Sequence, residues 1–269
     1  MRFVTLSLAV ALAACEAEKP RVTPVLPEPV SNNAVAIVDD TAYSFAGLKS
    51  GKTHADVTAD AFAVNLATGE RRNLPPLPDG KRRLASVATA VGARIYIFGG
   101  YTVAADGSEI STPDVFAFDP ASTSYARRAP MPTPVDDSVA CAYGTLIYLV
   151  SGWHNDGNTK AVQIYDTKAD TWTRASDYPG TPVFGHAGGC VDRAIVIVGG
   201  VTAEKLPTGK NKYAASEEGW FGEIDERDQK VIRWLPLRAP PVVARYRIAA
   251  VGSKALEAVG FSGGAENPY

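Results

Sequence analysis

The sequence predicts an all-β protein built from repeats of four antiparallel strands, and two observations support this prediction. One is a recurring apolar strand that ends in glycine, most clearly in Arg94–Tyr101 (RIYIFGGY). Runs of β-branched and aromatic residues of this kind are typical of strands. The other is spacing, because the last glycines of five related stretches are 53, 52, 48 and 60 residues apart, at Gly47, Gly100, Gly152, Gly200 and Gly260. A nearly fixed period of this length indicates an array of supersecondary units.

The composition limits both fold and function. With 269 residues, of which 46% are hydrophobic, the chain can bury a large core. Its 24 glycines and 19 prolines lie between apolar runs, as expected of many short strands joined by turns. The formal net charge is −2, and Lys81–Arg83 is the only clustered basic run. Nucleic-acid binding needs a clustered basic excess, so the composition argues against that class of function.

The amino terminus has the layout of a secretory signal. Met1–Arg2 supplies a positive charge, and the apolar run Phe3–Ala14 is too short to span a bilayer permanently. The run ends in Leu12–Cys15 (LAAC), which resembles the lipobox of bacterial lipoproteins. This resemblance implies cleavage before Cys15 and lipid attachment to it, and Glu16 next to it favours the outer membrane. The alternative is an ordinary signal peptide with a cysteine near its cleavage site.

The domain organisation follows from this layout. Residues 1–15 are the expected signal, and residues 16–33 contain four prolines with little apolar periodicity, so they are expected to form an extended tether. The folded part is expected to be 34–269. We therefore expect an exported protein that a lipid holds in the cell envelope, facing the periplasm.

Each repeat from residue 34 onward is expected to contain four strands of different composition. The first two are apolar at most positions, as in strands covered on both faces. The second ends in glycine, which permits positive φ and close backbone approach where sheets crowd together. The third ends in Asn65, Asp119, Asp166 or Asp225, whose side chain can bond its own backbone and start a turn. The fourth mixes charges with a bulky residue, as an outer edge would, before a proline-rich turn.

The expected strands can be given repeat by repeat. Those of the first repeat are Ala34–Val38, Ala42–Phe45, Ala61–Asn65 and Arg71–Leu74. Those of the second are Ser86–Val91, Ile95–Phe98, Val115–Asp119 and Tyr125–Arg128. Those of the third are Ser138–Tyr143, Ile147–Val150, Val162–Asp166 and Thr171–Arg174. Those of the fourth are His186–Val191, Ile195–Val198, Phe221–Asp225 and Ile232–Leu235, and a fifth repeat supplies only Ile248–Val251 and Leu256–Val259. Tyr125, Trp172 and Trp234 are expected to pack between adjacent sheets.

The repeats resemble those of the kelch family. The marks are the pairs Gly99–Gly100 and Gly199–Gly200, the fourth-strand Trp172 and Trp234, and the turn Pro130–Pro132. This resemblance implies a β-propeller with one four-stranded blade per repeat. The blades would cover about 34–78, 84–132, 136–180 and 184–241, with a partial fifth at 245–269. The first and fifth repeats depart from the pattern, since they lack the double glycine, and the third has Ser151–Gly152.

The partial fifth repeat leaves two readings of the whole array. Its outer two strands are missing, so a closed ring would expose half a blade. The chain is either a fragment of a longer propeller, of about six blades by the family resemblance, or an open array. We expect truncation, because propellers keep their exposed edges short and protected.

One face of such a propeller is expected to hold the functional site. It collects the loops that follow the glycines together with the loops that lead into each first strand. The candidate ligand-binding residues in these loops are Arg83, Tyr101, Asp137, Trp153, His154, His186, Arg245 and Arg247, with Asp136 next to Asp137. A polar mouth with an aromatic rim suits a carbohydrate or a peptide. The alternative is a channel whose polar residues only hold water.

Enzymatic chemistry has less support in the sequence. The three histidines, His54, His154 and His186, lie in different repeats without metal-ligand spacing, so neither a metal nor another cofactor is expected. Secreted bacterial kelch propellers include the sialic-acid mutarotases, which place an acid and an arginine in one blade loop. By that resemblance Glu204 is a candidate general acid or base, although only Lys205 and Lys210 follow it where an arginine would stand.

Two cysteines fall on the first strands of neighbouring repeats. Cys141 and Cys190 are one position apart in register, which points them to opposite faces of their sheets. We expect both to be small buried packing residues, with a disulfide as the alternative in an oxidising compartment.

The function that these observations favour is binding. We expect an envelope-anchored module that binds a protein or a carbohydrate through its loop face. The alternative is an enzyme that acts on a sugar such as sialic acid, of the mutarotase or epimerase type.

Overall fold

The computed structural model describes residues 25–155, 157–238, 250–252 and 256–258. The expected signal, the lipid-attachment candidate Cys15, and the candidates Arg245 and Arg247 lie outside these residues, as does most of the fifth repeat. No helix in the described part of the chain is long and apolar enough to cross a membrane.

Four antiparallel sheets, each containing the four strands of one repeat, make up most of the described chain, as the sequence predicts. Their strands follow in repeat order. The first sheet has β2 (Ala34–Val38), β3 (Thr41–Lys49), β4 (Val57–Asn65) and β5 (Arg71–Leu74). The second has β6 (Val87–Val91), β7 (Arg94–Phe98), β10 (Val115–Asp119) and β11 (Ser124–Arg128). The third has β12 (Val139–Tyr143), β13 (Leu146–Val150), β16 (Val162–Asp166) and β17 (Thr171–Arg174). The fourth has β18 (Ala187–Val191), β19 (Ala194–Val198), β22 (Gly219–Ile224) and β23 (Ile232–Leu237).

The remaining elements are short. β1 (Val30–Ser31) pairs with β3, so the last part of the expected tether belongs to the first sheet. A single 3-10 turn, η1 (His54–Asp56), joins β3 to β4. β24 (Ala250–Gly252) pairs with β25 (Leu256–Ala258), which fits the two strands expected of the fifth repeat.

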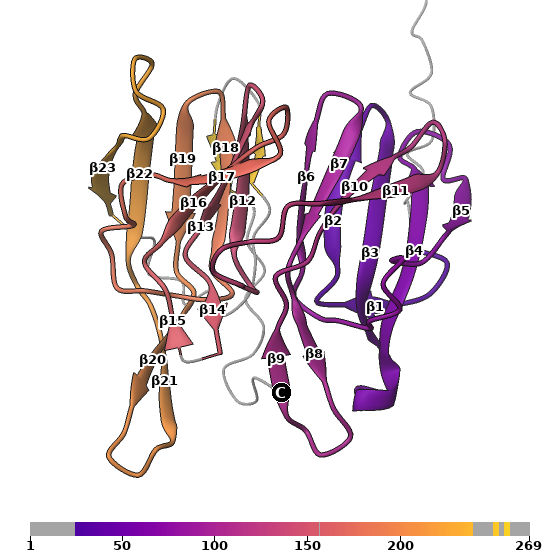
Figure 1. The fold of residues 1–269 in the computed structure, drawn as a ribbon, viewed down its shortest axis with the longest axis horizontal. Coiled ribbons are helices and arrows are strands. Elements are labelled where there is room, and N and C mark those ends of the chain that lie inside the picture. Colours follow the sequence, from indigo (N-terminus) through magenta and orange to yellow (C-terminus); the bar gives the residue numbers. More distant parts are fainter. Residues whose placement is uncertain (1–24, 156, 239–249, 253–255, 259–269) are drawn as a thin grey trace, which may run out of the picture.

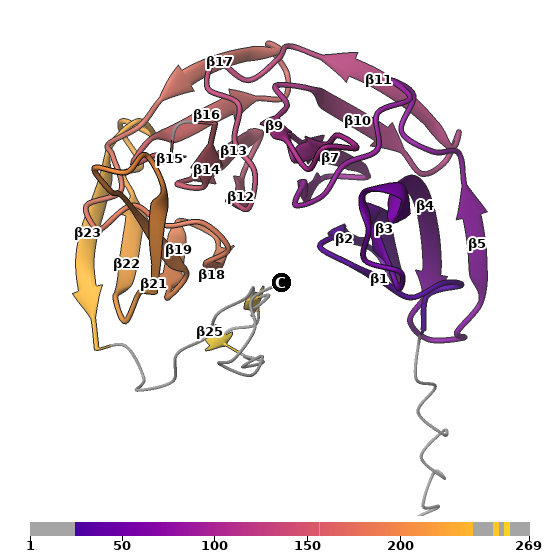
Figure 2. The same ribbon diagram turned by 90° about the horizontal axis from the view of Figure 1, so that it is seen from below.

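The four sheets are the blades of a propeller, arranged around a common axis (Figure 2). The first strand of each sheet (β2, β6, β12, β18) lies nearest the axis, and the fourth (β5, β11, β17, β23) lies at the periphery. The inner strands of successive blades are neighbours, β2 beside β6, β6 beside β12, and β12 beside β18. The second and third blades therefore each pack one face on the blade before and the other on the blade after.

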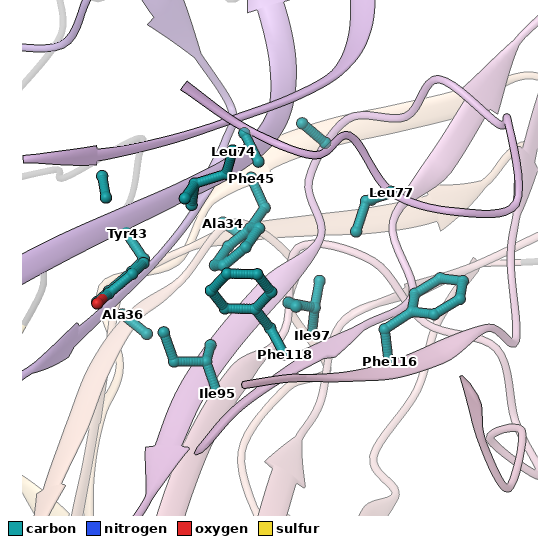
Figure 3. Close-up of a cluster of buried hydrophobic side chains, with 13 residues drawn as sticks. Ala34, Ala36, Tyr43, Phe45, Leu74, Leu77, Ile95, Ile97, Phe116 and Phe118 are labelled. Atoms are coloured by element: carbon teal, nitrogen blue, oxygen red, sulfur yellow. The ribbon is translucent and has the colours of Figure 1, made fainter. Parts of the chain in front are cut away.

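The core lies between blades rather than inside one of them. Figure 3 shows the layer between the first two blades, in which Phe45 of the first meets Phe118 of the second with ring centroids 5.5 Å apart. The fourth-strand aromatics close these layers as predicted: Tyr125, Trp172 and Trp234 each pack against one of the three inter-blade clusters. Burial of large aromatic surfaces dominates the stability of such interfaces.

Side chains at the ends of the third strands start the turns, as predicted. The Oδ1 atom of each accepts a hydrogen bond from the backbone N–H two residues later, at 2.8–3.0 Å, in Asn65, Asp119, Asp166 and Asp225. Each of these contacts satisfies a backbone N–H group in the hairpin turn that makes no hydrogen bond within the sheet.

Candidate functional site

The loops after the glycine-terminated strands form two-stranded hairpins on one face of the propeller (Figure 1). They are β8–β9 (Tyr101–Val103 and Glu109–Ser111), β14–β15 (Trp153–His154 and Gly157–Asn158) and β20–β21 (Val201–Lys205 and Asn211–Ala215). We call this side of the molecule the hairpin face. The sequence predicts variable polar loops here, and the structure pairs them into strands.

Each hairpin is tied to the loop that leads into the first strand of its own blade. The ties are isolated β-bridges between Leu84 and Tyr101, Asp136 and Trp153, and Phe184 and Val201. In the second blade, Leu84 N and Tyr101 N each donate to the other residue's carbonyl at 2.9 Å. The same device in three blades holds the post-glycine and pre-strand segments together, which is the juxtaposition that the sequence predicts.

A small pocket of about 50 Å³ opens where the three hairpins meet. Its lining residues come from three repeats: Tyr101, Glu109, Ser111, Asp136, Asp137, Trp153, Asn155, Phe184 and Tyr213. We call this the hairpin pocket.

Polar contacts join the second and third blades across the hairpin pocket. The Ser111 hydroxyl donates to Asp136 Oδ2 at 2.6 Å, and the Ser111 backbone N–H donates to Asn155 Oδ1 at 2.8 Å. These bonds cross between repeats, so they fix the β8–β9 hairpin against the third blade.

Glu109 lines this pocket, and the pKa of its carboxyl is raised. Partial burial raises the pKa of its carboxyl, and the nearby charge of Asp137 raises it further. A carboxyl group shifted in this way keeps its proton to a higher pH than an ordinary glutamate. It can therefore donate a hydrogen bond or exchange a proton with a bound molecule.

Three aromatic rings form the wall of the pocket toward the fourth blade. The Trp153 centroid lies 5.5 Å from that of Phe184 and 6.3 Å from that of Tyr213, and Phe184 and Tyr213 are 6.0 Å apart. Tyr213 is 52% exposed. The cluster offers a rigid, partly exposed aromatic surface of the kind that suits a sugar face or a partner side chain.

The structure brings three predicted residues together and separates the others. Tyr101, Asp137 and Trp153 line the hairpin pocket. His154 lies on the same hairpin as Trp153 but outside the pocket lining, and its Nδ1 donates to the Pro134 carbonyl at 2.6 Å. Glu204 lies on β20 opposite Lys212, exposed and likewise outside the lining.

Arg83 is a correction to the expected ligand-binding set, because its side chain is only 1% exposed. Its guanidinium pairs with Asp79 and lies 3.6 Å from Asp114, and it donates to the Gly99 carbonyl at 3.3 Å. The side chain thus ties the connection between the first two blades to the base of β10. A ligand on the hairpin face does not reach it.

His186 is the second correction, since it too is 1% exposed. Its Nε2 donates to the Val150 carbonyl of the preceding blade at 3.0 Å. A Cβ built on Gly200 would stand 2.7 Å from His186 Cβ, so the glycine makes room for the histidine. This contact explains one of the glycines that mark the repeats.

Five residues of the pocket are not among the candidates that the sequence identifies: Glu109, Ser111, Asn155, Phe184 and Tyr213. All lie in hairpins or pre-strand loops, which the sequence does place on this face. Four of them could have been found only by recognising that residues 101–111, 153–158 and 201–215 each fold back as a hairpin, and Phe184 only from its bridge to Val201.

A larger groove of about 670 Å³ lies near the fourth blade, and it contains none of the predicted residues. Glu218 in it accepts hydrogen bonds from the Thr181 hydroxyl at 2.6 Å and from Trp220 Nε1 at 2.9 Å. Its carboxylate ties the loop between the third and fourth blades to β22, as Asp114 does between the first and second.

Within the described ranges, no group of three or more histidine, cysteine, aspartate or glutamate side chains is placed to hold a metal ion.

Comparisons with known proteins match this architecture. The family described as the KLHDC2/KLHL20/DRC7 Kelch-repeats domain matches residues 34–215. Kelch-like protein 15 of Mus musculus is 28% identical over 137 residues, which are 51% of this chain and 22% of that protein. N-acetylneuraminate epimerase of Pasteurella multocida is 32% identical over 161 residues, which are 58% of this chain and 40% of that protein. The chain therefore spans well under two thirds of these relatives.

A solved structure has the same fold. The structure titled "Structure of YjhT" has a TM-score of 0.63 and 17% sequence identity, and the match covers 84% of this chain and 70% of that one. At this identity the likeness concerns the arrangement of blades.

Proposed function

Because the chain belongs to the kelch-repeat family, we propose that it is a binding module whose hairpin face docks on a partner protein. The observation that carries the proposal is the hairpin pocket, which three separate repeats build together. Kelch-like proteins are among the relatives, and loops on a rigid scaffold are the usual place for binding residues.

The size of the pocket favours a protein partner over a free small molecule. Pockets for drug-sized ligands have volumes of roughly 300–1,000 Å³. The hairpin pocket, at about 50 Å³, has room for one protruding side chain. Around it, Ile110 is 59% exposed and Tyr213 is 52% exposed, so apolar surface continues beyond the pocket. Aromatic side chains that become buried against a partner often supply most of the binding energy of a protein interface.

Replacing Tyr213 with alanine is expected to weaken partner binding by about tenfold or more while leaving stability nearly unchanged, because the ring is half exposed. The partner would first be captured by a photo-crosslinking amino acid placed at Ile110 in the full-length protein. Its affinity for the wild type and for Tyr213→Ala would then be measured by calorimetry. Leu235→Ala is the matched control, since Leu235 is 61% exposed on the peripheral strand β23. Equal affinities for wild type and Tyr213→Ala would contradict the proposal.

A second candidate function is proton transfer on a sugar. Two observations favour it: the similarity to N-acetylneuraminate epimerase of Pasteurella multocida, and the raised pKa of Glu109 beside an aromatic wall. In this scheme Glu109, which lines the hairpin pocket, is the general acid or base that opens the ring, rather than Glu204, which lies outside the lining.

Glu109→Gln is expected to reduce anomer exchange of N-acetylneuraminic acid by at least about 100-fold if this chemistry occurs, because general acid–base catalysis contributes about 10²–10⁴-fold. Exchange spectroscopy by NMR on the full-length protein measures it directly. Glu204→Ala is the control and should retain the wild-type rate. Wild-type protein that exchanges the anomers no faster than buffer eliminates this candidate and leaves the binding module.

Envelope anchoring completes the proposed function. The lipobox-like Leu12–Cys15 supports lipid attachment to Cys15, and residues 16–29 supply a proline-rich spacer before β1. The hairpin face would then meet its partner in the periplasm.

Cys15→Ser is expected to move the protein from the membrane fraction to the soluble fraction of bacterial cells, because the acylated residue is lost. Fractionation and metabolic labelling with a fatty acid measure this. Cys190→Ser serves as the control, with labelling unchanged. A wild-type protein that takes up no fatty acid would rule out the anchor and favour an ordinary secretory signal.

A further inference from the structure

The thiols of Cys141 and Cys190 face one another across the boundary between the third and fourth blades. Cys141 is the middle residue of β12 and Cys190 lies on β18, and these inner strands are neighbours. Both belong to the single apolar cluster between these blades. Neither forms a disulfide in this structure.

The register between the two strands follows from a neighbouring contact. A Cβ built on Gly188 would stand 3.0 Å from Val139 Cγ2, so position 188 faces position 139. Side chains on one face of a strand recur every second residue, so two residues further on position 190 faces position 141. One contact agrees with this: Cys190 Sγ lies 4.0 Å from the carbonyl oxygen of Ala142, the residue after Cys141.

The packing of neighbouring blades changes what the register of the two cysteines means for the distance between them. The sequence places the two cysteines on opposite faces of their sheets, which would separate them within one sheet. In a propeller, however, the forward face of one blade packs on the rear face of the next. Opposite faces are therefore what brings Cys141 and Cys190 together.

The two thiols differ in accessibility and in acidity. Cys141 is buried, and burial raises the pKa of its thiol, whereas Cys190 is half-buried and the hydrogen bond from Cys141 lowers the pKa of its thiol. A thiolate is the nucleophile in disulfide exchange. Cys190 is thus the residue that reacts first with an outside reagent, and Cys141 needs no access of its own.

We propose that Cys141 and Cys190 are a dithiol pair that closes to a disulfide between the third and fourth blades when the protein meets a disulfide oxidant. The Cys190 thiolate attacks one sulfur of the oxidant's disulfide, forming a mixed disulfide and releasing one oxidant thiolate. Cys141 then gives up its proton and attacks Cys190 Sγ, which expels the second oxidant thiolate. Two electrons and two protons pass to the oxidant, whose disulfide is reduced to two thiols.

The bond would close a loop of about 50 residues and cross-link the two strands nearest the axis. It would therefore restrain the inner edges of the blades that carry Trp153 and Tyr213. Exported proteins meet oxidising conditions in which such bonds persist, but the pairing itself depends on packing alone and not on the proposed function.

The test uses full-length protein incubated with oxidised glutathione as the disulfide oxidant. The protein is quenched in acid, unfolded and labelled with a maleimide, and its peptides are analysed by mass spectrometry. The expected result is simultaneous loss of the Cys141 and Cys190 thiols, with a peptide that links residues 129–160 to residues 175–193. The melting temperature should rise by about 5–10 °C and return to its starting value after reduction.

Two variants separate this result from other oxidation products. Cys190→Ala should leave Cys141 unreactive in the folded protein, because Cys141 is buried. Cys15→Ser should leave the internal bond intact. The proposal is overturned if both thiols of the wild type stay free under excess oxidised glutathione, or if Cys190 is found only as its glutathione adduct or joined to Cys15.

Discussion

Replacing Gly100 with alanine is expected to destabilise the protein by about 3–5 kcal/mol. Gly100 has φ +85°, and a Cβ at this position would stand 2.5 Å from the Leu84 carbonyl oxygen and 2.9 Å from the Ser86 backbone nitrogen. The Ser86 hydroxyl would be closer still, but rotating that side chain away would leave the two backbone atoms at the start of the second blade in place. Urea unfolding of the two proteins measures the difference.

Gly107→Ala is the matched control for this measurement. Gly107 has nearly the same backbone conformation, with φ +83°, but a Cβ there would meet nothing within 4 Å. Its substitution should cost only the backbone strain, about 1 kcal/mol. If the two variants lose similar amounts of stability, the positive φ alone would explain why position 100 is glycine. The close approach of the hairpin to the pre-strand loop would then be contradicted.

Arg83→Ala is expected to cost about 3–5 kcal/mol of stability, because it leaves the buried carboxylate of Asp79 without its cation. Asp79 is 3% exposed at its side chain and pairs with Arg83, and Asp114 is 8% exposed. Asp114 would keep Lys81 at 2.8 Å and Arg127 at 2.7 Å, whereas no other salt bridge to Asp79 is found among the described residues. Thermal or urea unfolding measures the loss.

Arg127→Ala is the control that shares a partner with Arg83. Its side chain is 59% exposed, so removing its bond to Asp114 should cost less than about 1 kcal/mol. If Arg83→Ala instead keeps wild-type stability and loses partner binding, Arg83 is a ligand residue, as its position in the sequence suggests, and its structural role here is wrong.

The fold was predictable because its determinants repeat within the sequence. Glycines about 50 residues apart, acids that end the third strands, and aromatics such as Trp172 on the fourth strands each recur with the period of the blades. These are local features, since each residue acts on its own blade or on the next. The structure finds the four blades where the repeats predict them.

The site was only partly predictable, because it depends on contacts between repeats that do not recur. Arg83 and Tyr101 both lie in segments that the sequence assigns to the loop face. Arg83 is buried because its guanidinium pairs with the carboxylates of Asp79 and Asp114, contacts that the repeat pattern does not reveal. The aromatic wall of Trp153, Phe184 and Tyr213 was likewise not predicted from the sequence, because its rings come from two hairpins and a connecting loop.

The arrangement of separate repeats around one mouth can be tested by nuclear Overhauser contacts between aromatic rings. The account predicts cross-peaks from Trp153 to Phe184 and to Tyr213, whose centroids are 5.5 and 6.3 Å away although the residues belong to different repeats. The pair Tyr165 and Trp172, 5.0 Å apart within one blade, serves as the positive control. Detection of the control with no cross-peak from Trp153 to either ring would contradict the shared mouth and the binding function proposed for it.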